Sequence, residues 1–133
     1  MAFIKTIKIR GYHCDSYGHL NNARYLELFE EARWSLLEEV NIIQPLKERG
    51  LLFFIVNINV NYRRAVDDGF TIEIHTQTDE IKRKTISFKQ TMYEKGSDTV
   101  LSDAIVTFVL FDPDQGKAIT IDPELQELFA TNG

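Results

Sequence analysis

Residues 12–34 read YHCDSYGHLNNARYLELFEEARW, and this stretch decides the fold. Its first half is polar and rich in turn formers, with Asp15 and Gly18 ahead of His19 and two asparagines. Its second half carries apolar residues at three- and four-residue steps, the period of a helix with one buried face. These residues are Tyr25, Leu28, Phe29, Ala32, Leu36 and Val40. The stretch therefore predicts a polar turn that leads directly into one long amphipathic helix.

The start of this helix is a place where a carbonyl group can be polarised. Either Asn21 or Asn22 can cap it, because an Asx side chain accepts a hydrogen bond from an amide of the first turn. A helix N-terminus presents unpaired backbone N–H groups and a partial positive charge. With Asp15 close by to act as a base or a nucleophile, the arrangement suits acyl transfer.

After Gly50 the apolar residues alternate with polar ones, which is the period of a half-buried strand. The predicted strands cover residues 56–62, 71–78, 85–93 and 100–111, and a fifth comes from the alternating N-terminal stretch 1–10. Asn41, Pro45 and Gly50 end the long helix and the turn after it. Pro123 opens a short helix through Phe129. One helix against a five-stranded antiparallel sheet is an α+β fold, and we expect a single domain over residues 1–133.

The composition is that of a soluble globular protein, with 44% hydrophobic and 26% charged residues among 133. A net charge of -5 gives no general attraction to nucleic acid or to an anionic membrane, so we expect neither partner. The longest apolar run, residues 51–56, is far too short to cross a bilayer, and the N-terminus does not look like a signal peptide. We therefore expect a cytoplasmic protein. Cys14 is the single cysteine, which excludes an intrachain disulfide and a thiolate zinc site.

The motif Asp15-x-x-Gly18-His19-Leu20-Asn21-Asn22-x-x-Tyr25 resembles the signature of the 4-hydroxybenzoyl-CoA-thioesterase-like branch of the hotdog-fold thioesterases. Further segments resemble, more narrowly, the bacterial long-chain acyl-CoA thioesterases of type III; they are residues 10–13, 21–27, 30–34 and 56–64. The resemblance implies a hotdog fold, in which the sheet wraps around the long helix. It also implies a homo-oligomer, a dimer or a homotetramer, that binds the thioester between protomers. The implied activity belongs to fatty acid metabolism: hydrolysis of a medium- or long-chain fatty acyl-CoA to the free acid and CoA, without metal or organic cofactor.

The resemblance also assigns roles within the motif. Asp15 matches the catalytic carboxylate of the family, which could attack the thioester directly or deprotonate a water; the sequence leaves both open. The oxyanion donor falls on the backbone N–H of Asn22. Gly18 supplies a positive φ or a close backbone approach, while His19 either orients Asp15, helps to place water, or only bonds to the backbone. Tyr25 packs in the core and shapes the pocket near Asp15.

The compact basic cluster at residues 82–85 is the predicted contact for the CoA nucleotide, because relatives carry basic and hydroxyl residues at this strand junction. Its alternative is a solvated bend. The two arginines that follow the second strand are weaker candidates for the same task. The predicted CoA contacts are therefore Arg63, Arg64, Arg83, Lys84 and Thr85.

The chain departs from its relatives after the second strand, where Arg64-Ala65-Val66 replaces the common Arg-Pro-Ala. Because the proline that would stiffen this exit is missing, we expect the loop to be placed differently. Another hotdog branch places its catalytic carboxylate on the helix, but Glu27, Glu30 and Glu31 are more simply a solvated or interface face. Two rival functions fit the same fold: a hotdog dehydratase or hydratase, and a non-catalytic module that binds acyl-CoA.

Overall fold

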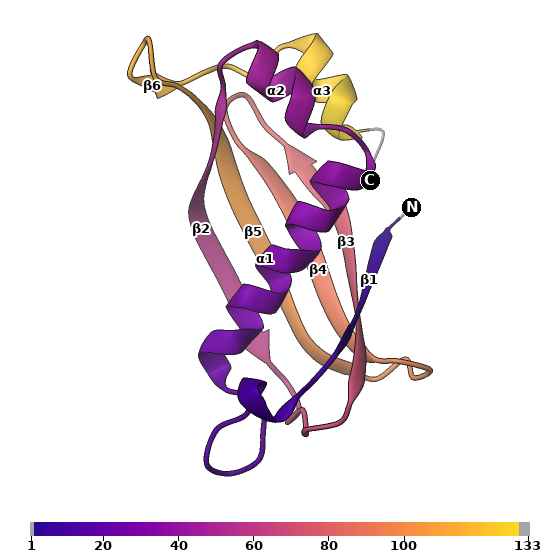
Figure 1. The fold of residues 1–133 in the computed structure, drawn as a ribbon. Coiled ribbons are helices and arrows are strands. Elements are labelled where there is room, and N and C mark those ends of the chain that lie inside the picture. Colours follow the sequence, from indigo (N-terminus) through magenta and orange to yellow (C-terminus); the bar gives the residue numbers. More distant parts are fainter. Residues whose placement is uncertain (1, 131–133) are drawn as a thin grey trace.

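A curved antiparallel sheet wraps around one long helix in the computed structural model, which describes residues 2–130 (Figure 1). The sheet strands are β1 (Phe3–Lys8), β2 (Leu52–Tyr62), β3 (Thr71–Ile81), β4 (Ile86–Glu94), β5 (Val100–Asp112) and the short β6 (Lys117–Ala118). The order across the sheet is β1-β3-β4-β5-β2, and β6 pairs with the end of β5. The predicted α+β architecture and its five long strands are confirmed, and only β6 was not expected. The predicted single domain includes Met1 and residues 131–133, which lie outside the described part.

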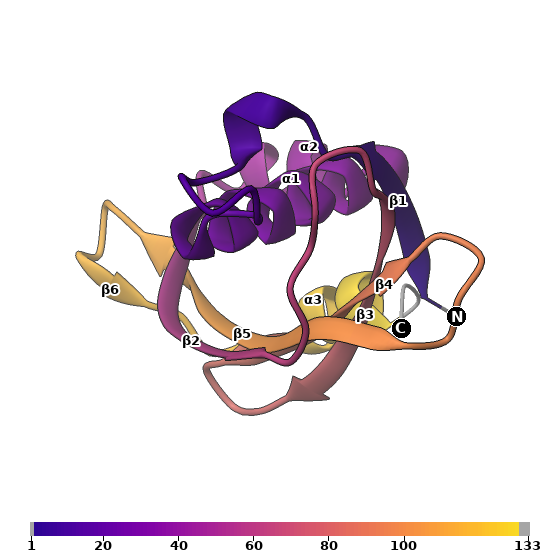
Figure 2. The same ribbon diagram turned by 90° about the horizontal axis from the view of Figure 1, so that it is seen from below.

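The long helix α1 (Asn22–Glu39) lies in the trough of the sheet, as the end-on view in Figure 2 makes plain. Its buried residues are Tyr25, Leu28, Phe29, Ala32, Arg33, Leu36 and Leu37. The predicted apolar face is thus confirmed from Tyr25 to Leu36, with Arg33 and Leu37 added, whereas Val40 is half-buried and caps the C-terminal end of the helix. Asn21 is the N-cap, because its side chain accepts a hydrogen bond from the Ala23 amide at 2.9 Å, and Asn22 is the first helical residue. Within residues 2–130 no helix has the length and apolar character needed to span a bilayer.

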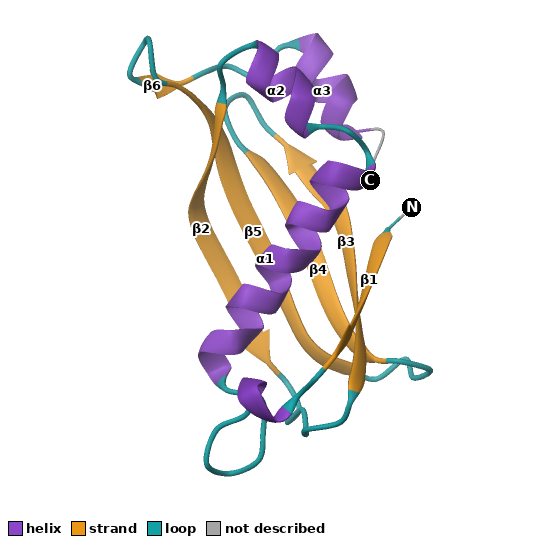
Figure 3. Ribbon diagram, in the orientation of Figure 1, coloured by secondary structure: helices purple, strands orange, loops and turns teal. Residues whose placement is uncertain are grey.

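Two short helices, α2 (Ile43–Glu48) and α3 (Pro123–Ala130), close one end of the curved sheet (Figure 3). The predicted helix at Pro123 is confirmed. Helix α2 was predicted as a turn because Pro45 stands inside it. Pro45 is tolerated there since it occupies the first turn, where the missing N–H has no helical acceptor to lose. A 3₁₀ turn, η1 (Gly11–His13), precedes the loop that leads into α1 at the other end.

Strand β2 differs most from its prediction, because it begins at Leu52 and is interrupted by a bulge between Ile55 and Asn57. Val56, expected on the buried face, lies in the bulge and is 56% exposed. Most of β2 is exposed because it forms an edge of the sheet. The charged bend predicted at residues 79–84 is shorter than expected, because β3 continues to Ile81.

A buried polar network joins α1 to the sheet beneath it. Arg33 is only 5% exposed, and its Nη1 donates to Gln90 Oε1 at 3.0 Å. The Gln90 amide donates in turn to the Phe29 carbonyl at 2.9 Å and to Thr76 Oγ1 at 3.0 Å. Burial lowers the pKa of Arg33, because the charged guanidinium has lost its contact with water. Gln90 therefore connects the middle of the helix to two strands.

Replacing Gln90 by Leu should lower the free energy of unfolding by about 2 to 4 kcal/mol, because the buried Arg33 guanidinium loses its acceptor. Urea unfolding at one fixed protein concentration measures the change. Lys89→Leu is the matched control, since Lys89 is the exposed neighbour on the same strand. Equal stability of the two variants would mean that the network contributes nothing.

Candidate active site

A tight loop holds Asp15 beside the start of α1. The amide of Asp15 donates to the His19 carbonyl at 2.9 Å, and the amide of Gly18 donates to the Asp15 carbonyl at 3.0 Å. Gly18 has a φ of 80°, the left-handed conformation expected of it, which a residue with a side chain adopts only at a cost. The limbs of the loop are joined by a bridge between Cys14 and Leu20. The loop therefore returns the chain to the helix start within a few residues of Asp15.

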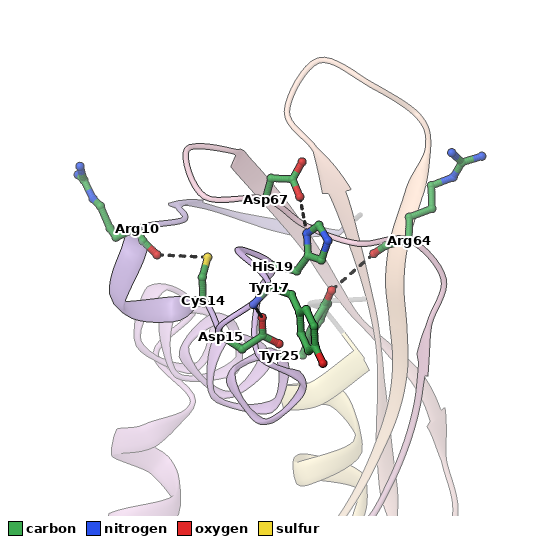
Figure 4. A network of polar contacts seen from close by, with 8 residues as sticks. All are labelled: Arg10, Cys14, Asp15, Tyr17, His19, Tyr25, Arg64 and Asp67. Carbon is green, nitrogen blue, oxygen red and sulfur yellow. Dashed lines mark hydrogen bonds and ion pairs between the residues drawn. The ribbon is translucent and has the colours of Figure 1, made fainter.

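The Asp15 carboxylate is oriented by its own turn. Its Oδ1 accepts a hydrogen bond from the Tyr17 amide at 2.9 Å (Figure 4). The other oxygen, Oδ2, has no hydrogen-bond partner within residues 2–130, and the side chain is exposed. A carboxylate held in this way can act on an incoming group through Oδ2.

The first turn of α1 offers a backbone donor close to this loop. The Asn21 side chain satisfies the Ala23 amide, and the Asn21 carbonyl accepts from the Arg24 amide at 2.8 Å. The amide of Asn22 belongs to the same turn and has no acceptor within the helix. It is therefore an amide free to donate to a bound carbonyl oxygen, the role that the family resemblance implies for it.

Tyr25 and Tyr62 connect the start of α1 to the end of β2. The rings of Tyr25 and Tyr62 meet edge to face with centroids 4.9 Å apart, and the Tyr62 hydroxyl donates to the Asn22 carbonyl at 3.1 Å. The Tyr25 hydroxyl lies 3.5 Å from the Arg64 carbonyl. Burial raises the pKa of Tyr25, and Tyr62 adds to the effect, so the phenol keeps its proton. Tyr25 is thus a core residue whose hydroxyl faces the predicted site.

A shallow hollow of about 290 Å³ lies between these elements on the protomer surface. Its lining residues are His19, Leu20, Asn22, Tyr25, Tyr62 and residues 63–65. Five predicted site residues therefore share one hollow: His19, Asn22 and Tyr25 of the motif, and Arg63 and Arg64 of the predicted CoA contacts. Asp15 and Gly18 lie on the adjoining loop and do not line it. An open hollow of this kind cannot enclose a long substrate by itself.

The side chain of His19 contacts Asp67, and within residues 2–130 it makes no hydrogen bond to Asp15, the residue that one predicted alternative has it orient. Its Nδ1 lies 2.7 Å from Asp67 Oδ1, and the two residues also form a backbone bridge (Figure 4). Asp67 was not predicted as a site residue, because it is 48 residues away in sequence. The substitution at residues 64–66 was the available signal, since it marked the loop that brings Asp67 to His19.

The neighbouring Cys14 and His13 have local structural partners. The Cys14 thiol lies 3.7 Å from the Arg10 carbonyl, and burial, with help from nearby aspartates, raises the pKa of this thiol. A thiol with a raised pKa is a poor nucleophile. Nδ1 of His13 accepts from the Arg10 amide at 2.9 Å. No cluster of His, Cys, Asp and Glu that could hold a metal ion occurs within residues 2–130.

The predicted CoA contacts are divided between the two ends of the sheet. Arg63 and Arg64 lie at the end of β2 beside the hollow, but Arg63 is paired with Asp103, and Figure 4 shows the Arg64 guanidinium turned away from Asp15. Arg83, Lys84 and Thr85 lie in the turn between β3 and β4, at the end closed by α2 and α3. Strand β2 alone spans roughly 33 Å from end to end at 3.3 Å per residue. One protomer therefore does not bring all five residues to one place.

A second hollow, of about 350 Å³, lies at the end that carries Lys84. Its cationic lining residues are Arg49, Lys84 and Lys117, of which sequence reasoning identified only Lys84. Arg49 is paired with Asp122 at 2.7 Å.

The glutamates of α1 are exposed as expected, and Glu27 pairs with Arg24 at 2.7 Å.

Comparison with known proteins agrees with this geometry. Residues 9–129 match the family described as the Thioesterase-like superfamily. The chain is 40% identical to the long-chain acyl-CoA thioesterase FadM of Escherichia coli over 91% of this chain and 92% of the relative, and 29% identical to the acyl-CoA thioesterase YbgC of Haemophilus influenzae over 86% and 85%. The crystal structure of the probable thioesterase YbaW of Escherichia coli covers 94% of both chains, with a TM-score of 0.90 and 39% identity. This chain therefore belongs to the Thioesterase-like superfamily and has its hotdog fold.

Proposed function

We propose that this protein hydrolyses medium- or long-chain fatty acyl-CoA to the free acid and CoA. The observation that carries the proposal is the free oxygen of Asp15 beside the first turn of α1, in a chain 40% identical to a protein named as a long-chain acyl-CoA thioesterase. A substrate carried by soluble CoA fits a cytoplasmic enzyme of fatty acid metabolism. No residue role in this scheme requires a metal or an organic cofactor.

In the proposed reaction the thioester carbonyl oxygen accepts a hydrogen bond from the Asn22 amide. The partial positive charge of the helix start stabilises the negative charge that develops on this oxygen. Asp15 either attacks the carbonyl carbon, which expels CoA as a thiolate and leaves a mixed anhydride for water to cleave, or removes a proton from the attacking water. Both routes use the same two groups in the same positions.

The acyl chain would follow the seam between α1 and β2. Both elements carry exposed apolar side chains, Leu26 and Trp34 on α1 and Ile58 on β2, and a slot of about 80 Å³ lies between α1 and the start of β2. Trp34 borders the slot and stands twelve residues after Asn22, which corresponds to roughly 18 Å along a helix. An extended chain of about fourteen carbons spans such a length, because each C–C bond of about 1.5 Å advances a zigzag chain by about 1.3 Å. The seam therefore suits a long chain better than a short one.

Strand β2 is the edge that a second protomer would cover. It is eleven residues long and exposes a row of large apolar side chains. These are Leu52, Phe54, Ile55, Val56, Ile58 and Tyr62. The opposite edge, β1, is only six residues long and carries Lys5 and Lys8, which discourage pairing. A long, apolar, unpaired edge favours association with a second copy, and two-fold symmetry is the usual result.

Antiparallel pairing of β2 with its symmetry mate would bring opposite ends of two protomers together. The Asp15 end of one protomer would then face the Lys84 end of its partner. This arrangement accounts for the division of the predicted CoA contacts, because the thioester and the nucleotide would be bound by different chains. We therefore propose a dimer, or a tetramer built from such dimers, as the active form.

Replacing Asp15 by Asn should reduce thiol release from acyl-CoA by at least ~100-fold, the low end for a positioned acid-base group, while binding of the substrate persists. The swap keeps the shape of the side chain and removes the base and nucleophile. Asp98→Asn, in the exposed turn after β4, is the control for the loss of one charge. Turnover near the wild-type rate in the Asp15 variant would overturn the assignment. Binding of acyl-CoA by the wild type without turnover would instead favour the binding module, and reaction beside the carbonyl without thiol release would favour the dehydratase or hydratase.

Replacing Ile58 by Lys should convert the oligomer to monomers and abolish activity, because a charge would be buried at the proposed β2 interface. Sedimentation velocity measures the assembly state. Ile4→Lys is the matched control, since Ile4 is an exposed isoleucine on the opposite edge strand and should tolerate the change. A fully active wild-type monomer would refute the proposal.

Replacing Arg83 and Lys84 by Ala should raise KM for acyl-CoA about tenfold with little change in kcat, because phosphate contacts lie far from the reacting carbonyl. Pantetheine thioesters, which lack the nucleotide, should be affected less. The double variant Lys89→Ala/Lys95→Ala removes the same charge from other exposed positions and serves as the control. An equal loss of activity with CoA esters and pantetheine thioesters would show that the cluster is a solvated turn and does not contact the nucleotide.

Mixed dimers test whether the two halves of the site come from different chains. In a dimer of one Asp15→Asn chain and one Arg83→Ala/Lys84→Ala chain, one site regains every wild-type residue only if Asp15 and the basic cluster belong to different protomers. We expect recovery of low-KM activity in such mixtures. Failure to recover would place both groups in one chain.

A further inference from the structure

His19 and Asp67 are joined through both their backbones and their side chains. Their backbones pair as an isolated antiparallel bridge, and Asp67 Oδ1 lies 2.7 Å from His19 Nδ1. No other side chain within residues 2–130 contacts the His19 ring through a hydrogen bond. Asp67 is therefore the group that sets the orientation of this imidazole.

The loop that carries Asp67 is anchored on both sides. The Leu20 amide donates to the Val66 carbonyl at 2.7 Å, and Val66 is completely buried. On the other side, the Gly69 amide donates to the Ile9 carbonyl at 3.0 Å, and Lys8 Nζ donates to the Gly69 carbonyl at 2.8 Å. These contacts fix the backbone around Asp67. Its carboxylate is therefore held next to His19 without the entropic cost of ordering a mobile loop.

The contact determines which imidazole nitrogen is free. An ionised carboxylate only accepts hydrogen bonds, so Nδ1 of His19 must carry the proton that it donates to Asp67. In the neutral ring, Nε2 then has a lone pair and points away from Asp67. Because His19 lines the hollow together with Asn22 and Tyr25, an acyl carbon bound in the hollow would lie close to this ring.

We propose that Asp67 is a positioning residue for His19, and that Nε2 of His19 takes the proton of the water that attacks the acyl carbon. This inference rests on the proposed thioesterase function. In the step, a water O–H bond breaks and an O–C bond forms, while the carbonyl electron pair moves onto the oxygen held by Asn22. The proton goes to Nε2, and the imidazolium is stabilised by Asp67. The water attacks the mixed anhydride formed when Asp15 has expelled CoA, and collapse of the intermediate expels the Asp15 carboxylate.

The first test compares Asp67→Ala with Asp68→Ala, which removes the neighbouring carboxylate that does not contact His19. The Asp67 variant should lose at least ~10-fold in kcat with KM changed by less than about twofold, because only the proton-transfer step is impaired. The Asp68 variant should keep wild-type kcat. An unchanged kcat in Asp67→Ala would overturn the proposal.

A double-variant comparison tests whether Asp67 acts through His19. In a His19→Gln background, Asp67→Ala should cause no further loss of kcat, since the group that it positions is already absent. A purely structural role of Asp67 would give the same loss in both backgrounds. That result would overturn the proposal.

A measurement that does not depend on activity separates this proposal from the proposed function. The chain has three histidines, so ¹⁵N spectra of labelled protein at alkaline pH can be assigned with His19→Gln. We expect the Nδ1-protonated tautomer for His19 in the wild type and its loss in Asp67→Ala. An Nε2-protonated tautomer in the wild type would overturn the role of Asp67. If instead the wild type shows the expected tautomer but releases no thiol from any acyl-CoA, the thioesterase function fails and the proposed proton transfer fails with it.

Discussion

The burial of one face of α1 against the concave sheet is the constraint on which the rest of the protomer depends. Phe29 and Ala32 lie almost fully buried under the sheet, and Gln90 fixes the middle of the helix through the Phe29 carbonyl. Because rotation and sliding of α1 are both blocked, its first turn must lie at the end of β2, where Tyr62 bonds to the Asn22 carbonyl. The loop that carries Asp15 then closes onto a helix start that is already in place.

The same packing leaves apolar side chains exposed on the β2 side of the protomer. The sheet covers α1 from β1 to β2 (Figure 2), while Trp34 of α1 and Ile58 of β2 remain exposed in the described chain. Large apolar side chains that stay exposed are costly in water and are often covered by a partner or a ligand. In the proposed enzyme, one surface would serve both the partner protomer and the acyl chain. Burial of the same apolar side chains would therefore stabilise both the dimer and the bound acyl chain.

Local periodicity was enough to predict α1, the five long strands and α3, because each of these elements is encoded by its own neighbouring residues. It failed where the outcome depends on distant parts of the chain. The exposure of Val56 follows from the place of β2 at the sheet edge, which no pattern within β2 records. Asp67 meets His19 only after β2 has run the length of the sheet edge and returned the chain to the start of α1. The division of the basic residues between two ends is likewise a property of topology and not of spacing.

The distribution of charge adds an argument about how an acyl-CoA would enter. Asp15, Asp67 and Asp68 cluster around the helix start, where each contributes to the raised pKa of the Cys14 thiol. Lys84 and Lys117 lie at the opposite end, and neither has an ion-pair partner within residues 2–130. In the proposed dimer, the unpaired Lys84 and Lys117 of one protomer would attract phosphates, whereas Arg63 near the Asp15 end is already paired with Asp103. Although the chain is acidic, this local positive charge would bind the CoA phosphates and so direct the thioester towards Asp15. Added salt should weaken this electrostatic attraction.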